Sequence, residues 1–127
     1  MNNEIEDMYN NRFDWVMAQP NKWWDDCHNF IQLLFPTTKP SAHHPESPLL
    51  TIEDAQFLVA NAEKIEHAVG RFKAFMIECD QFYQFNHNFL RITRIIQCLV
   101  EIGNLVEAKA FYNWAATRYI NNNTDVE

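Results

Sequence analysis

The sequence predicts an all-α protein, a single-domain bundle of about five helices with one long Pro-rich loop. Apolar residues recur at intervals of three and four along most of the chain, which is the spacing of one helix face. No segment keeps the alternation of a strand, and two Gly are few for an all-β protein that needs many tight turns. With 127 residues and 47% hydrophobic content, residues 1–127 are expected to form one domain with a core over about 13–120.

Charge and cysteine content narrow the classes of partner and compartment. A net charge of -7 disfavours nucleic acid as a partner, because a phosphate backbone attracts basic surfaces. No apolar run approaches the ~20 residues of a membrane span, and the polar start MNNEIEDMYNN is unlike a signal peptide. Three Cys without paired spacing fit a reducing compartment, so a cytoplasmic location is expected.

The N-terminal third is expected to hold one main helix. Met1–Asn11 is predicted to be a loose polar start, and Phe13–Met17 a single helical turn that ends near Pro20. The next helix covers residues 21–35, begins at a capping Asn21 and is stopped by Pro36. Its core stripe is Trp24, Cys27, Ile31, Leu34 and Phe35.

The segment Pro36–Leu50 holds four of the five Pro and is expected to be an ordered loop packed against the domain. Thr51 then opens a helix as its N-cap, with Asp54 completing a capping box, and Asn61 is a candidate break. From Ala62 to Tyr83 the apolar spacing predicts a long helix. The Gly70 in its middle would be explained by a close approach of another helix backbone.

The stretch Asn86–Gly103 carries the broadest apolar face and is expected to be the central helix. Gly103 stands where a left-handed stop is wanted, and Asn104 can cap a final helix over Leu105–Tyr119. We expect the helix Phe89–Ile102 to be the most buried, flanked by Trp24–Phe35 and Leu105–Tyr119. Its predicted apolar face is Phe89, Ile92, Ile95, Ile96, Leu99, Val100 and Ile102, and one side of its polar face is His87, Arg91, Arg94 and Cys98.

Two stretches together resemble the conserved N-terminal domain of the opioid growth factor receptor family. The first, HNFIQLLFP, matches the family run of His, Asp or Asn, an aromatic, Ile, Gln, Trp, Leu, Phe and Pro, with Leu33 in place of the Trp. The second, HNFLRITRII, matches the family core His-Asn-x-Leu-Arg-Ile-Thr-Arg-Ile, and a Gly follows at the right distance. The matching positions are Trp24, His28, Asn29, Phe30, Ile31, Gln32, Leu34, Phe35, Pro36, His87, Asn88, Leu90, Arg91, Ile92, Thr93, Arg94, Ile95 and Gly103, with weaker matches at Ser41 and Ser47–Leu49.

The resemblance implies an α-helical domain and, as in the animal receptor, peptide binding with nuclear or peripheral membrane association and no transmembrane bundle. The long C-terminal repeat region of the animal members is not in this chain, whose size resembles stand-alone members. We therefore expect a non-catalytic helical module that binds a peptide or protein partner. The expected groove lies between the helices His28–Phe35 and Phe89–Ile102.

Three side chains of the central helix are the leading ligand candidates. His87, Arg91 and Arg94 share one helix side in an acidic chain, and Arg forks suit carboxylates or phosphates. The competing interpretation, which we favour, is that the arginines bind the protein's own acidic residues or helix-end carbonyls. Arg94 is expected to take the deeper structural position, whereas Arg91 borders the apolar face and is the better ligand candidate. The acidic residues in question are Asp25, Asp26, Glu78 and Asp80.

Four other polar positions have the same two interpretations. His28, Asn29 and Gln32 could contact a ligand, although anchoring of the Pro-rich loop is favoured because an irregular loop leaves many backbone groups to pair. Asn88 is expected to cap its helix, with ligand contact as the minor alternative.

No sequence feature supports catalysis or a cofactor. No CxxC, HxxxH or HExxH spacing supports a metal, and no nucleophile or phosphate-loop motif is present. Two alternatives to a binding module remain: a small enzyme with His28 or His87 as general base and an anionic substrate, and a structural or self-associating protein. Neither the ligand nor the oligomeric state follows from the sequence.

Overall fold

The computed structural model describes residues 3–41, 44–79 and 87–124. For residues 87 and 119–124 it describes the backbone only. These residues form helices and irregular segments and contain no strand, which confirms the all-α prediction. The helices are α1 (Asn3–Asp7), the π-helix η1 (Met8–Arg12), α2 (Phe13–Met17), α3 (Asn21–Asp26), α4 (Asn29–Leu34), α5 (Ile52–Ala60), α6 (Ala62–Cys79), α7 (His87–Glu101) and α8 (Leu105–Thr124).

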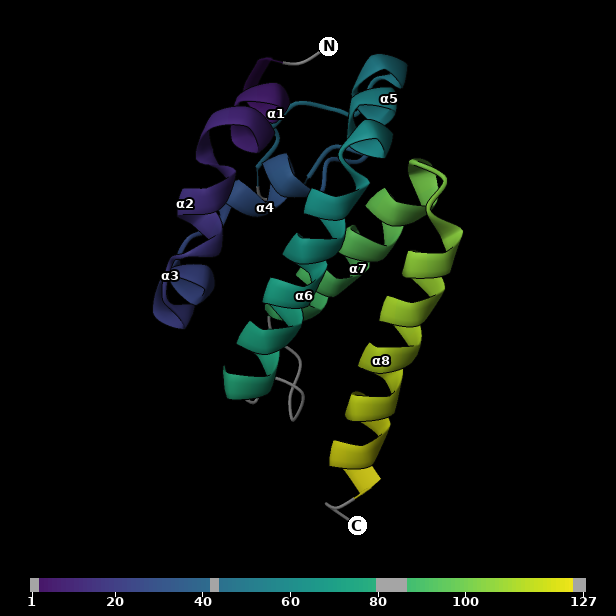
Figure 1. Cartoon of the computed structure of the whole chain (residues 1–127). Coiled ribbons are helices and arrows are strands. Elements are labelled where there is room, and N and C mark those ends of the chain that lie inside the picture. Colours follow the sequence, from purple (N-terminus) through teal and green to yellow (C-terminus); the bar gives the residue numbers. More distant parts are fainter. Residues whose placement is uncertain (1–2, 42–43, 80–86, 125–127) are drawn as a thin grey trace.

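Helices α6 and α8 run in the same direction down the molecule, and α7 crosses between them (Figure 1). The short helices α1 to α4 lie to one side, where α3 packs on α6 and α4 packs on α1 and η1. Large apolar side chains from the short N-terminal helices and from the long helices meet in one core. Its largest fully buried members are Trp24, Tyr9, Phe35, Phe72, Phe75, Phe111, Ile5, Met8, Ile31, Leu34 and Leu58.

The N-terminus is part of the core, so the prediction of a loose polar start is wrong. Ile5, Met8 and Tyr9 are fully buried, and the Tyr9 hydroxyl donates to the Leu34 carbonyl at 2.5 Å. Their spacing of three and one places all three on the inner side of a helical stretch. The core therefore begins at Ile5 and not near residue 13.

The helix predicted over residues 21–35 is divided in two, which is a second correction. Pro20 is the N-cap of α3, so Asn21 is its first residue and not its cap. At Cys27 the backbone turns to an extended conformation, with ψ 132°, and α4 begins only at Asn29. The break leaves carbonyl groups at the end of α3 without helical partners, and their partners define the site described below.

The Pro-rich segment is held against the domain over its described residues. The Leu50 N–H donates to the Thr37 carbonyl at 2.9 Å, which ties the two ends of the segment together. The N–H and hydroxyl of Thr38 both donate to the Glu101 carboxylate of α7. Thr37 and Leu50 are buried, which agrees with the prediction of a packed loop.

Caps and breaks predicted in the second half are confirmed. Thr51 and Asp54 form both hydrogen bonds of a capping box at the start of α5. Asn61 ends α5, and its carbonyl accepts the first hydrogen bonds of α6. Gly103 has φ 85° and its N–H donates to Val100, while the Asn104 side chain accepts the Glu107 N–H at 3.3 Å. The chain thus turns from α7 directly into α8, and these two helices make the most extensive pairing in the fold.

Three further expectations about the long helices need correction. A Cβ built at Gly70 would meet no atom within 4 Å, so no backbone approaches it. Helix α7 is flanked as predicted but is not the most buried, because α4 buries four of its six residues. On α7, Val100 of the predicted apolar face is exposed, whereas Arg91 and Cys98 of the predicted polar face are buried. The predicted helix end at residues 80–83 lies outside the described residues.

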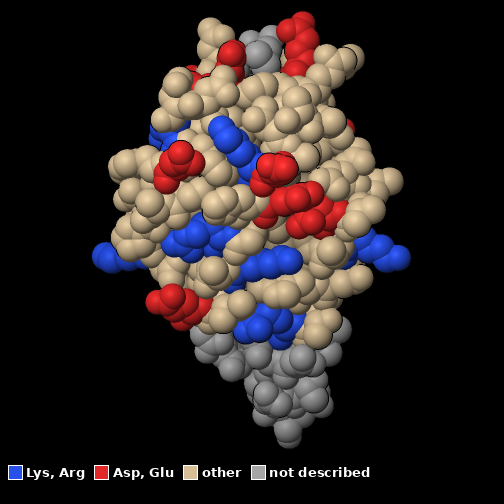
Figure 2. All heavy atoms as spheres, viewed as in Figure 1, with Lys and Arg blue, Asp and Glu red and all other residues tan. Residues whose placement is uncertain are grey.

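Charges are unevenly spread over the face that carries α6 and α8. Figure 2 shows most of its acidic side chains in the upper half and Lys and Arg side chains in a band below them. Of the helices within the described ranges, none is both long enough and apolar enough to cross a membrane.

Candidate functional site

Arg91 of α7 occupies the break between α3 and α4. Its guanidinium donates to the carbonyl of Trp24 and to the carbonyl of Cys27, each at 2.5 Å. These are carbonyls that the end of α3 leaves without helical partners, so Arg91 supplies the cap that the local chain lacks. The same guanidinium lies 5.6 Å from the centre of the Phe30 ring. Arg91 therefore connects three helices from one buried position.

Burial governs the electrostatics of Arg91. Its side chain is only 5% exposed, and this desolvation lowers the pKa of Arg91 to about 10, an effect that the nearby Asp25 carboxylate partly opposes. Asn88, fully buried one turn earlier, accepts from Arg91 at 3.2 Å and donates toward Asp25 at 3.5 Å. Asn88 thus links the carboxylate to the guanidinium. It is the second residue of α7 and lies inside the helix, one position after its first residue.

His28 and Gln32 lie beside the same break. His28 Nδ1 lies 3.4 Å from the Arg91 guanidinium, which fits a neutral imidazole that accepts from it. The buried Gln32 amide, oriented so that its nitrogen donates, reaches the carbonyls of His28 and Asn29 at 2.6 and 3.1 Å. The Gln32 amide thus bonds back to carbonyls of its own helix start, and these contacts do not involve the Pro-rich loop. The loop meets this region through His44, whose ring stacks with that of His28 at 6.4 Å.

Arg94 lies at the rim of this arrangement, which reverses the predicted depths of the two arginines. It donates to the Phe35 carbonyl at 3.1 Å, a helix-end carbonyl as predicted, but its side chain is only partly buried. Burial also lowers the pKa of Arg94 from its usual value. Arg91 is the deeper residue because the α3–α4 break opens directly over it. His87 is the first residue of α7, and its side chain lies outside the described set.

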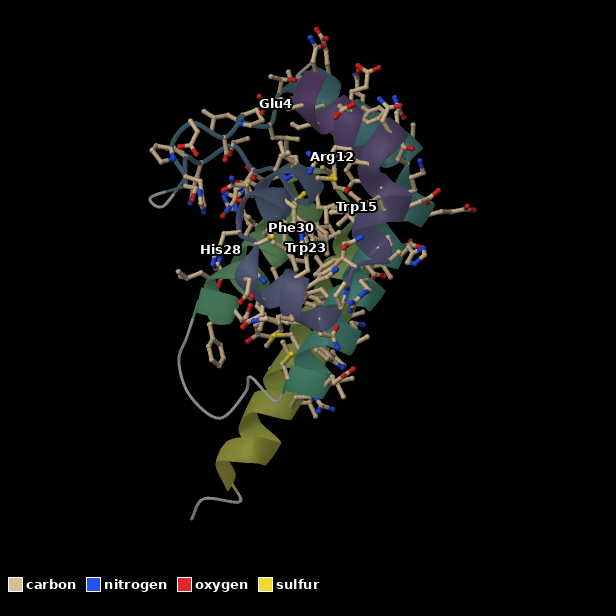
Figure 3. The ribbon with its side chains drawn as sticks, turned by 90° about the vertical axis from the view of Figure 1, so that its left-hand side faces the viewer. Glu4, Arg12, Trp15, Trp23, His28 and Phe30 are labelled. Atoms are coloured by element: carbon tan, nitrogen blue, oxygen red, sulfur yellow. The ribbon has the colours of Figure 1, made fainter. Side chains whose placement is uncertain are left out.

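An open hollow of about 400 Å³ lies on the outer side of the break. Trp23 and Phe30 form its aromatic floor, with ring centres 4.6 Å apart. Trp15 of α2 packs edge-on against Trp23 at 5.4 Å and is 55% exposed. Figure 3 shows Arg12 above the Trp23 and Phe30 rings and His28 to their left. The hollow is lined by Arg12, Trp23, Asp26, Cys27, His28, Asn29, Phe30 and His44.

Helix η1 explains how Arg12 reaches this hollow. Arg12 is the last residue of the π-helix, and Met8 and Tyr9 of the same turn are buried in the core. A π-turn adds a residue to the helical turn, so it changes the direction of the side chains that follow. Arg12 and Trp15 were not among the sequence candidates. The sequence signal that could have indicated this surface is an Arg and a Trp three residues apart, on either side of the buried Phe13.

The arrangement brings His28, Gln32, Asn88 and Arg91 together, but in mutual contacts and not around an empty groove. The expected groove between α4 and α7 is filled by the two arginines on this side. Among the described residues, no group of three His, Cys, Asp or Glu side chains could hold a metal ion. A concave surface beside the break is instead provided by the aromatic hollow on α3 and α4.

These features define an all-α protein with an arginine-filled helix break and an aromatic, basic-rimmed hollow beside it. No family model, curated protein or solved structure matches the chain.

Proposed function

We propose that the chain is a non-catalytic helical module that binds a peptide or protein partner, of the type of the opioid growth factor receptor domain that its motifs resemble. The binding surface in this proposal is the hollow on α3 and α4. Three residues of the first matching motif, His28, Asn29 and Phe30, line it. The two motifs would then act together: Arg91 of the second motif holds the break, and residues of the first motif at the break form the hollow.

The observation that carries the proposal is the exposed Trp15 beside the aromatic floor of the hollow. A Trp with 55% of its surface in water exposes apolar area that a partner could cover. Trp and Arg are also the residue types that contribute most to binding at protein interfaces. Trp15, Trp23 and Arg12 gather on this one surface (Figure 3).

The chemistry of the lining indicates the kind of peptide. An apolar or aromatic side chain would pack on Trp23 and Phe30. An acidic group next to it would meet Arg12 at the rim, while Asp26 is already paired with Lys22 at 3.0 Å. A cytoplasmic or nuclear location remains part of this proposal, since all three Cys are free thiols.

Binding of the intact chain to an immobilised array of peptides with paired aromatic and acidic residues tests this function. We expect Trp15→Ala and Arg12→Ala each to weaken the bound signal by about tenfold or more, because each removes a principal contact. Val106→Ala is the matched control, since Val106 is 84% exposed on α8, far along the chain from the hollow. Equal signals from all three variants would overturn the proposed binding surface.

A further inference from the structure

A second hollow, of about 300 Å³, lies between α7 and the start of the Pro-rich segment. One wall comes from α7 and the other from the segment that follows α4. It shares no residue with the aromatic hollow, so it is a separate candidate for a site. It is lined by Thr37, Lys39, Pro40, Ser41, Leu90, Thr93, Arg94 and Gln97.

The lining is positively charged in a protein of net charge -7. Among the residues that the structure describes, Lys39 and Arg94 are the charged members of the lining, and no carboxylate belongs to it. Glu101 is a carboxylate that acts on Arg94 electrostatically. Both oxygens of Glu101 already accept hydrogen bonds from Thr38. Within the described part of the lining, two cations therefore face the hollow and no carboxylate neutralises them.

Donor groups remain for a ligand. Arg94 uses Nη1 for the Phe35 carbonyl, whereas a guanidinium carries five N–H donors. Ser41 Oγ accepts the His44 N–H at 3.2 Å, so its own hydrogen can turn toward the hollow. Thr37 and Thr93 instead donate to the carbonyls of Lys39 and Phe89 and form its walls. The donors toward the hollow are thus one guanidinium, one ammonium, one hydroxyl and the Gln97 amide.

We propose that this hollow binds a phosphate group, either as the free anion or as the phosphate monoester of a partner's side chain. A doubly charged tetrahedral oxyanion matches two cations, and a guanidinium fork suits its oxygens. Leu90 and Pro40 at the edge would contact the carbon atoms that an ester carries. The proposal goes beyond the peptide-binding function and does not depend on it, because the two hollows have different linings.

Calorimetric titration of the full chain tests the site with inorganic phosphate, a short phosphoserine peptide and its unphosphorylated form. Both phosphate ligands should bind and the unphosphorylated peptide should not. Equal affinity of phosphate and phosphopeptide would assign the site to the free anion, and tighter binding of the phosphopeptide would assign it to a modified partner. Absence of phosphate binding at about 10 mM would overturn the proposal.

Variants locate the binding. Lys39→Glu and Arg94→Gln should each lower phosphate affinity by about tenfold or more. Lys109→Glu is the control, because it makes the same charge change at an exposed position of α8 outside the hollow. Lys39 is exposed in the loop, so Lys39→Glu is expected to fold. The test can therefore still be decided if Arg94→Gln does not fold. Equal losses for Lys39→Glu and Lys109→Glu would show that net charge, and not this hollow, holds the anion.

Discussion

Arg91 is a case in which one side chain completes secondary structure far away in the sequence. Its hydrogen bonds to Trp24 and Cys27 span 67 and 64 residues. Without Arg91 the Trp24 carbonyl would be buried and the Cys27 carbonyl part-buried, both without a partner at the helix end. An unpaired buried group costs about 1–3 kcal/mol. A Lys at this position would keep the charge but lose the planar fork that reaches both carbonyls.

At the residue scale we predict that Arg91→Ala lowers the free energy of unfolding by about 3 kcal/mol or more, because it leaves both carbonyls unpaired. Arg94→Ala removes one hydrogen bond at a partly exposed position and should cost about 1 kcal/mol. Urea denaturation followed by Trp fluorescence measures both values. A larger loss for Arg94→Ala than for Arg91→Ala would contradict the depths seen in the structure.

The sequence identifies the arginines as a pair on one helix side, but it does not give their order of burial. That order depends on where α3 ends, and the spacing of Trp24, Cys27 and Ile31 continues a helical stripe across the break. Asn88 shows the same limit, since its partners Asp25 and Arg91 come from two helices. Side chains whose role is set by a distant backbone group cannot be assigned from local periodicity.

At the scale of the element, the two Gly residues should respond to Ala in opposite directions. Gly103 has φ 85°, which an L residue rarely adopts, so Gly103→Ala should destabilise the protein by about 1 kcal/mol even though no atom blocks a Cβ. Gly70 lies inside α6 with open space around it, so Gly70→Ala should stabilise by about 0.5–1 kcal/mol. Thermal unfolding of both variants measures the signs, and a stabilising Gly103→Ala would contradict this interpretation.

Local signals predicted the elements that depend on local chemistry. The capping box of Thr51, the stop at Gly103 and the cap at Asn104 all lie within a few residues of the groups they satisfy. The break at Cys27 has no such signal, because neither Gly nor Pro stands there. It is stabilised by Arg91, a residue on another element, and tertiary contacts of this kind override local propensity.

At the scale of the whole molecule, the N-terminal helices should contribute a large share of stability. The double variant Ile5→Ala, Met8→Ala removes two fully buried side chains and should cost about 4 kcal/mol or more. Glu4→Ala with Asn10→Ala is the control on exposed positions of the same stretch, with an expected change within about 0.5 kcal/mol. Urea midpoints that coincide for the two double variants would place the N-terminus outside the core.

Fold class, the paired long helices and the packed loop were predictable because each rests on periodicity or on strong turn residues. The burial of the N-terminal stretch was not predictable, because its polar and acidic residues together outnumber its apolar ones. Only three inward positions, Ile5, Met8 and Tyr9, make the contact with the core. The aromatic hollow could not be predicted either, because it depends on how α2, α3 and α4 are placed relative to one another. The spacing of Trp and Phe within each segment gives no information about that placement.

The position of Arg91 also bears on how the chain folds while it is being made. Cys27 is synthesised 64 residues before the side chain that binds its carbonyl. At about 5–20 residues per second, this is an interval on the order of several seconds. During that interval the carbonyls of Trp24 and Cys27 lack the guanidinium that binds them in the folded protein. The native contacts at the break therefore cannot form until Arg91 has been synthesised.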